Sequence, residues 1–230
     1  MRAATAGLAS EDVRVSRIYL GGPEVGIEID GAIRGSTPDL LTVLDRNPLE
    51  DAKWLGVDAA ATEGAIDGRL SLAFPLLASI SIDDVKISAS GAGRNMALPG
   101  VISDWTLTAD RLELDVNAER LRFKGNGALL AEPVSFAGDL FFGAKGDRAR
   151  IKGEWCASRN GHRAIGLGSA AGSRLLTGIA PTKFNVRATT GYAYEIGFDA
   201  DLTQATLLAQ EIGWLKPKGQ PAKVSGIAIL

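Results

Sequence analysis

The sequence is nearly without the side chains that most enzymes use for acid–base or nucleophilic chemistry. Among 230 residues it has one histidine, His162, and one cysteine, Cys156. A single cysteine cannot form an internal disulfide, and one histidine with one cysteine cannot complete a closed zinc shell. No G-x-S-x-G motif accompanies His162, so a Ser-His-Asp arrangement is not indicated. The sequence therefore predicts a protein that is not an enzyme and that holds no metal and no cofactor.

Neither sign of charge dominates, and long hydrophobic runs are missing. Lys and Arg number 25 against 27 Asp and Glu, and the basic residues are not clustered, so nucleic acid is not an expected partner. No apolar run approaches the 18 residues of a membrane span, and the opening MRAATAGLASED has no secretory signal pattern. If the chain acts outside the cytoplasm, we therefore expect it to be an excerpt of a longer protein or a processed form.

What is present is a repeated alternation of apolar and polar residues, which is typical of half-buried strands. In GAIDGRLSLAFPL, residues 64–76, Leu70, Leu72 and Phe74 fall on one side of an extended chain, while Arg69 and Ser71 fall on the other. Similar runs recur every 8 to 12 residues or so with turn signals between them, which predicts an antiparallel all-β protein. No Pro/Gly/Ser-rich linker interrupts the series, so we expect one β-rich domain over residues 1–230.

One stretch breaks the alternation and predicts helix. Ser36-Thr37-Pro38 supplies a cap and an early proline, and leucines follow at helical spacing, so short helices are expected over 38–46 and 48–56. A further short helix fits residues 173–179, and Pro181 would end it.

Turn signals divide the predicted strands. Asn160-Gly161 is a two-residue hairpin signal, so His162 is expected at a solvent-facing tip. A Gly-Asn-Gly break is expected at 125–127. Asp83-Asp84 fits a bulge better than a pair of catalytic acids or a calcium corner. Residues 166–171, GLGSAA, match the dinucleotide fingerprint only formally, because no long helix follows them, so we interpret them as a flexible loop. Cys156 is expected as a small, partly buried hydrophobe.

From residue 48 onward the order of features resembles one known family. The segments are PLEDAKWLGVDAAATEGAIDGRLSLAFPL, ISIDDVKISASGAGRNMALPGV with its Ala-Leu-Pro-Gly turn, WTLTADRLELDVNAERLRFKGNGALLAEPV, and FDADLTQATLLAQEIGWLKPKGQPAKVSG with its Gly-Trp-x-Lys-Pro motif. Together they are similar to the conserved region of the YhdP-like members of the AsmA superfamily of bacterial envelope proteins, over residues 48–225. This chain lacks the family's N-terminal membrane helix and is much shorter than a full member.

The resemblance implies a long, sharply curved antiparallel sheet that forms a taco-like groove lined with apolar side chains. It also implies a periplasmic segment of an inner-membrane-anchored protein that moves phospholipid towards the outer membrane and so maintains its barrier. Lipid transport needs a continuous apolar surface rather than acids or bases, and the alternating strands meet that need. The same alternation also fits a structural module of the cell envelope with a closed core and no ligand, whose edge strands pair with neighbouring segments.

On the lipid hypothesis, phospholipid acyl chains lie along one apolar face, and head groups stay at its solvent-facing mouth. The candidate contacts are Ile66, Leu70, Leu72, Phe74, Ile80, Ile82, Trp105, Leu107, Leu112, Leu114, Phe123, Phe136, Leu140 and Phe142.

Overall fold

The computed structural model describes most of the chain. The described residues are 3–5, 8–19, 25–44, 58–76, 84–102, 105–142, 146–158, 161, 176–189, 194–209 and 212–229. Within them the protein is mainly β, built on a large, curved antiparallel sheet with one short α-helix and one 3-10 turn, which confirms the fold class predicted from the alternation and the resemblance.

The strands and helices follow in this order: β1 Ala3–Thr5, β2 Leu8–Tyr19, β3 Gly26–Ser36, α1 Thr37–Leu44, η2 Ala59–Ala61, β4 Glu63–Pro75, β5 Lys86–Ile102, β6 Trp105–Asn117, β7 Arg120–Leu129, β8 Glu132–Phe141, β9 Asp147–Ala157, β10 Leu176–Gly178, β11 Ala180–Thr189, β12 Tyr194–Asp201, β13 Ala205–Ala209, β14 Trp214–Lys216 and β15 Lys223–Ile229.

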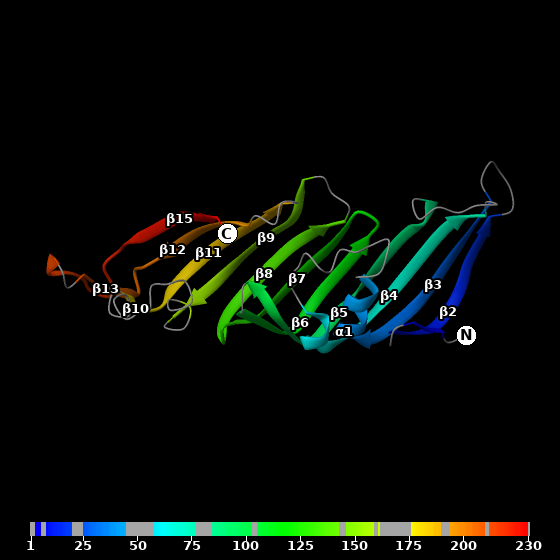
Figure 1. The fold of residues 1–230 in the computed structure, drawn as a ribbon, viewed down its shortest axis with the longest axis horizontal. Helices are drawn as coiled ribbons and strands as arrows, with labels where there is room; N and C mark the ends of the chain where they lie inside the picture. Colours follow the sequence, from blue (N-terminus) through cyan, green and yellow to red (C-terminus); the bar gives the residue numbers. More distant parts are fainter. Residues whose placement is uncertain are drawn as a thin grey trace.

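The large sheet is an open meander. Its order within the described residues is β1-β2-β3-β4-β5-β6-β7-β8-β9-β11-β12-β15, so up to β9 each strand pairs with its neighbours in sequence. The remaining strands, β10, β13 and β14, form a separate small sheet. In Figure 1 the strands stand side by side along an elongated body, with β2 at the right and β13 at the left.

Directly opposed residues of paired strands share one face of a sheet, so the register defines the faces. One such row crosses the sheet from β4 to β15 and mixes glycine with large apolar residues. It consists of Ile66, Gly93, Leu112, Gly125, Phe136, Gly153, Phe184, Phe198 and Gly226. The alternation of the sequence therefore produces one continuous apolar face.

The glycines of this face give space to the aromatic rings of neighbouring strands. A Cβ on Gly138 would lie 2.8 Å from the tip of the Phe123 ring, and one on Gly226 would lie 2.8 Å from the tip of the Phe198 ring. The rings of Phe123 and Phe198 therefore lie over glycines of the next strand and cover the backbone there.

The helix α1 begins where the sequence predicts it. The Ser36 hydroxyl accepts a hydrogen bond from the backbone N–H of Asp39 at 3.3 Å, which satisfies one of the free donors of the first turn. The helix packs against β3 and β4, and Thr37 is buried there against Gly64.

Several local predictions are wrong. The Gly-Asn-Gly segment at 125–127 does not break a strand but lies inside β7. Ala97 to Gly100 are part of β5 rather than a turn, although the register shifts between Pro99 and Ile102. Residues 176–178, expected as the end of a helix, form β10.

One prediction about the end of β9 is also wrong. Cys156 is exposed on β9 rather than partly buried. On its other side β9 pairs with β11, which begins at Ala180. Other expectations fall outside the described residues: the helix over 48–56, Ile80, Ile82, Asp83, the hairpin signal at Asn160, His162 and the segment 166–171.

Candidate functional site

The apolar face of the large sheet carries the described candidate lipid contacts of β4. Leu70, Leu72 and Phe74 are half-buried, whereas Ile66 is buried. Their polar neighbours Arg69 and Ser71 lie on the opposite face, as the alternation predicts.

In the middle of the sheet this face is a packed core, which we call the central cluster. Its members are Met96, Ala109, Leu112, Leu129, Val134, Phe136, Trp155 and Ala157. Leu112 and Phe136 are only 6% and 7% exposed, and the partly buried residues Trp105, Leu107, Leu114 and Phe123 pack against the cluster. Trp105 and Trp155 stand 5.8 Å apart between ring centroids. The structure therefore brings these six predicted residues together.

Leu140 belongs to a neighbouring cluster with Ala149 and Ala188, and Phe123 packs against both clusters. Phe142 follows the end of β8 and is half-buried; its backbone N–H donates to the carbonyl of Glu119 at 2.8 Å. Phe142 is not part of the described clusters.

At the N-terminal end the same face is much less covered. Two rows of directly opposed residues make up what we call the N-terminal strip: Val15, Ile29, Leu72 and Ile87 in one row, and Ile18, Ile27 and Phe74 in the other. Val15 and Ile18 are 57% and 53% exposed, and the other members are half-buried.

The sequence reasoning missed part of this face. Ile27 and Ile29 share a phase that the sequence reveals, but they were not counted as candidate contacts, and nor was Ile87. The candidate list also stops at residue 142, although the face continues through Ile151 and Phe184. The signal that could have found these residues is the cross-strand pairing, because each lies opposite a residue of the same face.

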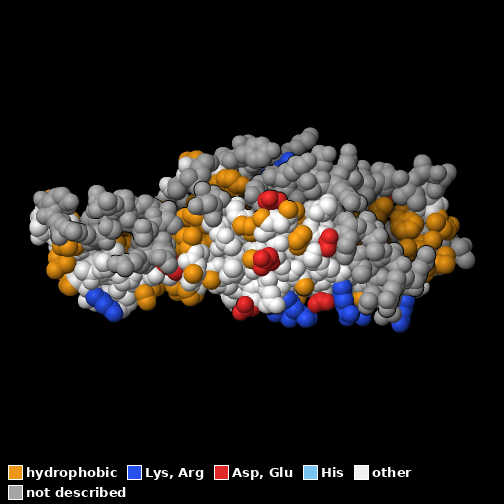
Figure 2. Space-filling view, turned by 60° about the horizontal axis from the view of Figure 1, so that its bottom comes forward, with side chains coloured by type: hydrophobic (Ala, Val, Ile, Leu, Met, Phe, Trp, Pro, Cys, Tyr) orange, Lys and Arg blue, Asp and Glu red, His pale blue; other side chains and the backbone are white. Residues whose placement is uncertain are grey.

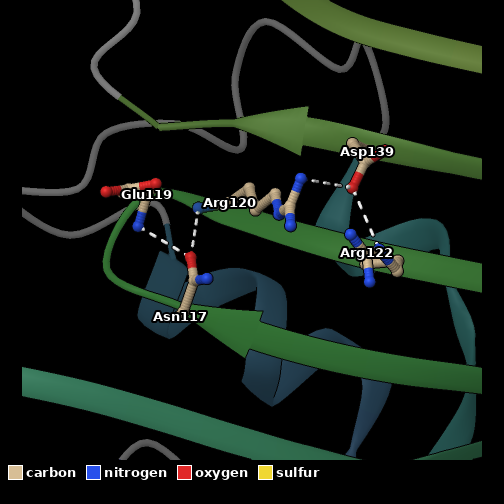
Figure 3. A network of polar contacts seen from close by, with 5 residues as sticks. All are labelled: Asn117, Glu119, Arg120, Arg122 and Asp139. Atoms are coloured by element: carbon tan, nitrogen blue, oxygen red, sulfur yellow. Dashed lines mark hydrogen bonds and ion pairs between the residues drawn. The ribbon is translucent and has the colours of Figure 1, made fainter.

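The opposite face is polar and is held by arginines that share a carboxylate. Figure 3 shows Asp139 between Arg120 and Arg122, with nitrogen–oxygen distances of 3.6 and 3.3 Å. Nearby, the Asn117 side-chain oxygen accepts the backbone N–H groups of Glu119 and Arg120, which shapes the turn between β6 and β7. Further along, Asp67 lies between Arg34 and Arg94 at 3.4 and 3.2 Å.

Asp147 binds two arginines that face each other across β9 and β11. Its carboxylate oxygens lie 2.7 Å from Arg150 Nε and 2.6 Å from Arg187 Nε. The hydrogen bond from Arg150, followed by that from Arg187, lowers the pKa of Asp147 below its ordinary value, and the same carboxylate raises the pKa of Arg187. This arrangement offsets the repulsion of two opposed cations.

The polar face also has a hollow of about 380 Å³ over β2 to β6. Small residues form its floor, with Arg14 and Asp30 at one side and Asp115 at the other. The hollow lies on the face opposite the N-terminal strip.

A buried carboxylate closes the end of the central cluster. Glu132 is 5% exposed, and its carboxylate accepts the backbone N–H groups of Ser158 at 2.9 Å and Gly161 at 3.2 Å. These bonds tie the chain that follows β9 to the turn between β7 and β8.

Within the described ranges no three His, Cys, Asp or Glu residues gather as metal ligands, and no helix is long and apolar enough to cross a membrane.

Large hydrophobic residues that are exposed gather at the two ends of the molecule. Figure 2 shows orange patches at its right and left ends. The residues at the N-terminal end are Val15, Ile18, Val25 and Leu76, and those at the C-terminal end are Ile179, Ile212, Trp214, Leu215, Val224, Ile227 and Ile229.

Comparisons of the chain with models of known families, with curated proteins and with solved structures gave no match.

Proposed function

We propose that the chain is a lipid-binding segment of a bacterial envelope protein that moves phospholipid between the inner and outer membranes. Acyl chains lie along the N-terminal strip, and head groups face solvent. The observation that carries the proposal is the one-sided sheet: a continuous apolar face whose large side chains on the N-terminal strip, across β2 to β5, remain half-buried or exposed. The resemblance to the YhdP-like proteins supports the same function.

The N-terminal strip suits an acyl chain because it offers apolar area without directional bonds. Each methylene removed from water contributes roughly 0.8 kcal/mol, so affinity depends on contact length rather than on a specific hydrogen bond. Among the described residues, β2 to β5 contact chiefly their neighbours in the sheet and α1. The side chains of the strip are therefore candidates for contact with a ligand.

The central cluster favours a second candidate function. Leu112 and Phe136 are buried within the protein alone, so this part of the face is a core rather than an open surface. A structural envelope module that pairs through its edge strands would need such a core and no ligand. We therefore propose lipid contact at the N-terminal strip. Lipid contact at Leu112, Phe136 and Leu140 is a prediction from the sequence that we do not carry into the proposal.

Extraction of the purified protein with organic solvent, followed by mass spectrometry, tests the proposal. We expect phospholipid in near-stoichiometric amount. Absence of phospholipid, together with exclusion of an added fluorescent fatty acid, would overturn the lipid proposal and favour the structural module.

A pair of charge substitutions on β4 locates the lipid. Leu72→Glu places a carboxylate on the N-terminal strip and should lower lipid loading while the fold survives, because Leu72 is half-buried. Ser71→Glu is the matched control, since it adds the same charge one residue away on the polar face. Equal loading of the two variants would contradict the proposed position of the acyl chains.

A further inference from the structure

Large apolar side chains are exposed on β14 and just before it. Ile212 is 78% exposed, Trp214 49% and Leu215 55%. Trp214 and Leu215 are adjacent on a strand, so they point to opposite sides, and the tip is apolar on both faces. In Figure 1 the hairpin lies at the left extremity of the molecule, beyond β12 and β15.

The base of this hairpin is fixed by an unusual buried lysine. Lys216 is 2% exposed, and its Nζ donates to the carbonyls of Leu202 at 2.7 Å, Ala205 at 2.8 Å and Pro217 at 3.3 Å. An ammonium has three N–H donors, so all three are satisfied by backbone. The apolar tip is therefore presented on a rigid base rather than on a loose loop.

Two exposed lysines lie close to the tip in sequence, Lys218 and Lys223. Lys216 is buried, and its ammonium is bound by backbone carbonyls, so it adds no exposed charge. The acids of this part of the sequence are Glu211 and Asp201, and Asp201 lies directly opposite Lys223 across β12 and β15. Lys218 therefore supplies exposed positive charge next to β14.

We propose that the β13–β14 hairpin docks on an anionic phospholipid bilayer, with its tip inserted at the membrane–water interface. Tryptophan prefers the head-group level, while aliphatic side chains enter the acyl region beside it. Lysines next to the inserted tip are attracted to anionic head groups. The proposal does not rest on the lipid-carrying function, because the hairpin is separate from the N-terminal strip.

Flotation with vesicles tests this docking. The full chain should float with vesicles of phosphatidylethanolamine and phosphatidylglycerol, and bind less to phosphatidylcholine alone or at high salt. The double variant Ile212→Ser with Trp214→Ser should partition roughly a hundredfold more weakly, because two large apolar side chains are lost. The matched control is Val25→Ser with Leu76→Ser, two exposed aliphatic residues at the other end, which should bind as the wild type does.

A second readout reports on the tip itself. Brominated lipids should quench part of the tryptophan emission of the wild type, and this part should be missing from Trp214→Phe. Equal flotation of the double variant and the wild type overturns the proposal. The proposal is also overturned if the wild type does not bind vesicles but forms a concentration-dependent dimer that the double variant abolishes. Loss of flotation with unchanged co-purified lipid separates this site from the proposed lipid-carrying face.

Discussion

The central cluster and the N-terminal strip are parts of one apolar face, yet they differ in what covers them. Phe136 in the central cluster is buried. Phe74 on the N-terminal strip is half-buried, and its row continues through Ile27 to the exposed Ile18. Both regions arise from the same alternating pattern. Alternation therefore determines which side chains share a face, whereas the packing around that face determines whether it is core or surface.

The largest expected effect comes from a charge placed in each region. Leu112→Glu buries an unpaired carboxylate in the central cluster, which costs more than about 4 kcal/mol, so we expect the protein not to fold. Leu72→Glu on the N-terminal strip should leave a folded protein. Circular dichroism and urea unfolding of both variants check this contrast. If both variants unfold, the strip is core too, and the comparison fails.

Truncating one phenylalanine in each region gives a smaller effect. Phe136→Ala should lower the free energy of unfolding by about 3–5 kcal/mol, because it leaves a cavity in a packed cluster. Phe74→Ala should cost roughly half as much, since the side chain is already partly in water. Urea unfolding of the two variants measures the ratio, and equal losses would contradict the difference in packing.

Much of this comparison follows from the sequence, and part of it does not. The phase of β4, β6 and β8 is readable because Leu70, Leu112 and Phe136 alternate with polar residues. The position of α1 is readable because Ser36 and Pro38 are local signals. Local signals failed where tertiary pairing overrides them: Gly125 and Gly127 predict a break, but in β7 they give space to neighbouring strands.

The candidate site was predictable only as a set of residues with one phase. Leu112 is buried because residues of other strands pack around it: Phe136 of β8 and Trp155 of β9 belong to its cluster, and Phe123 of β7 packs against that cluster. The alternation pattern carries no information on which strands come together, so it cannot distinguish Leu112 from Leu72. The exposure of Trp214 could not be predicted for the same reason, because it depends on how the strands after β12 pair.

Two glycines, Gly138 of β8 and Gly26 of β3, differ in the space around them. A Cβ on Gly138 would lie 2.7 Å from the carbonyl oxygen of Arg150 and 2.8 Å from the Phe123 ring, so Gly138→Ala should cost about 1–3 kcal/mol. On β3, a Cβ on Gly26 would meet its nearest atom at 3.1 Å, so Gly26→Ala should cost about 1 kcal/mol or less. Thermal unfolding of both variants tests this order, and a larger loss for Gly26→Ala would reverse it.

The smallest expected effect comes from carboxylates on the polar face of the sheet that bind arginines. Arg150 and Arg187 lower the pKa of Asp147, so the charged form is favoured in the folded protein. Its stabilising contribution is present above the ordinary aspartate pKa and is lost as pH falls through the lowered value. The stability difference between the wild type and Asp147→Asn should therefore be full at neutral pH and shrink in acid. Urea unfolding over a series of pH values measures it. The matched variant is Asp67→Asn, whose arginines lie farther away, at 3.4 and 3.2 Å, so its effect at neutral pH should be smaller. A gap for Asp147→Asn that stays constant into acid would show that its two arginines do not hold the carboxylate in its charged form.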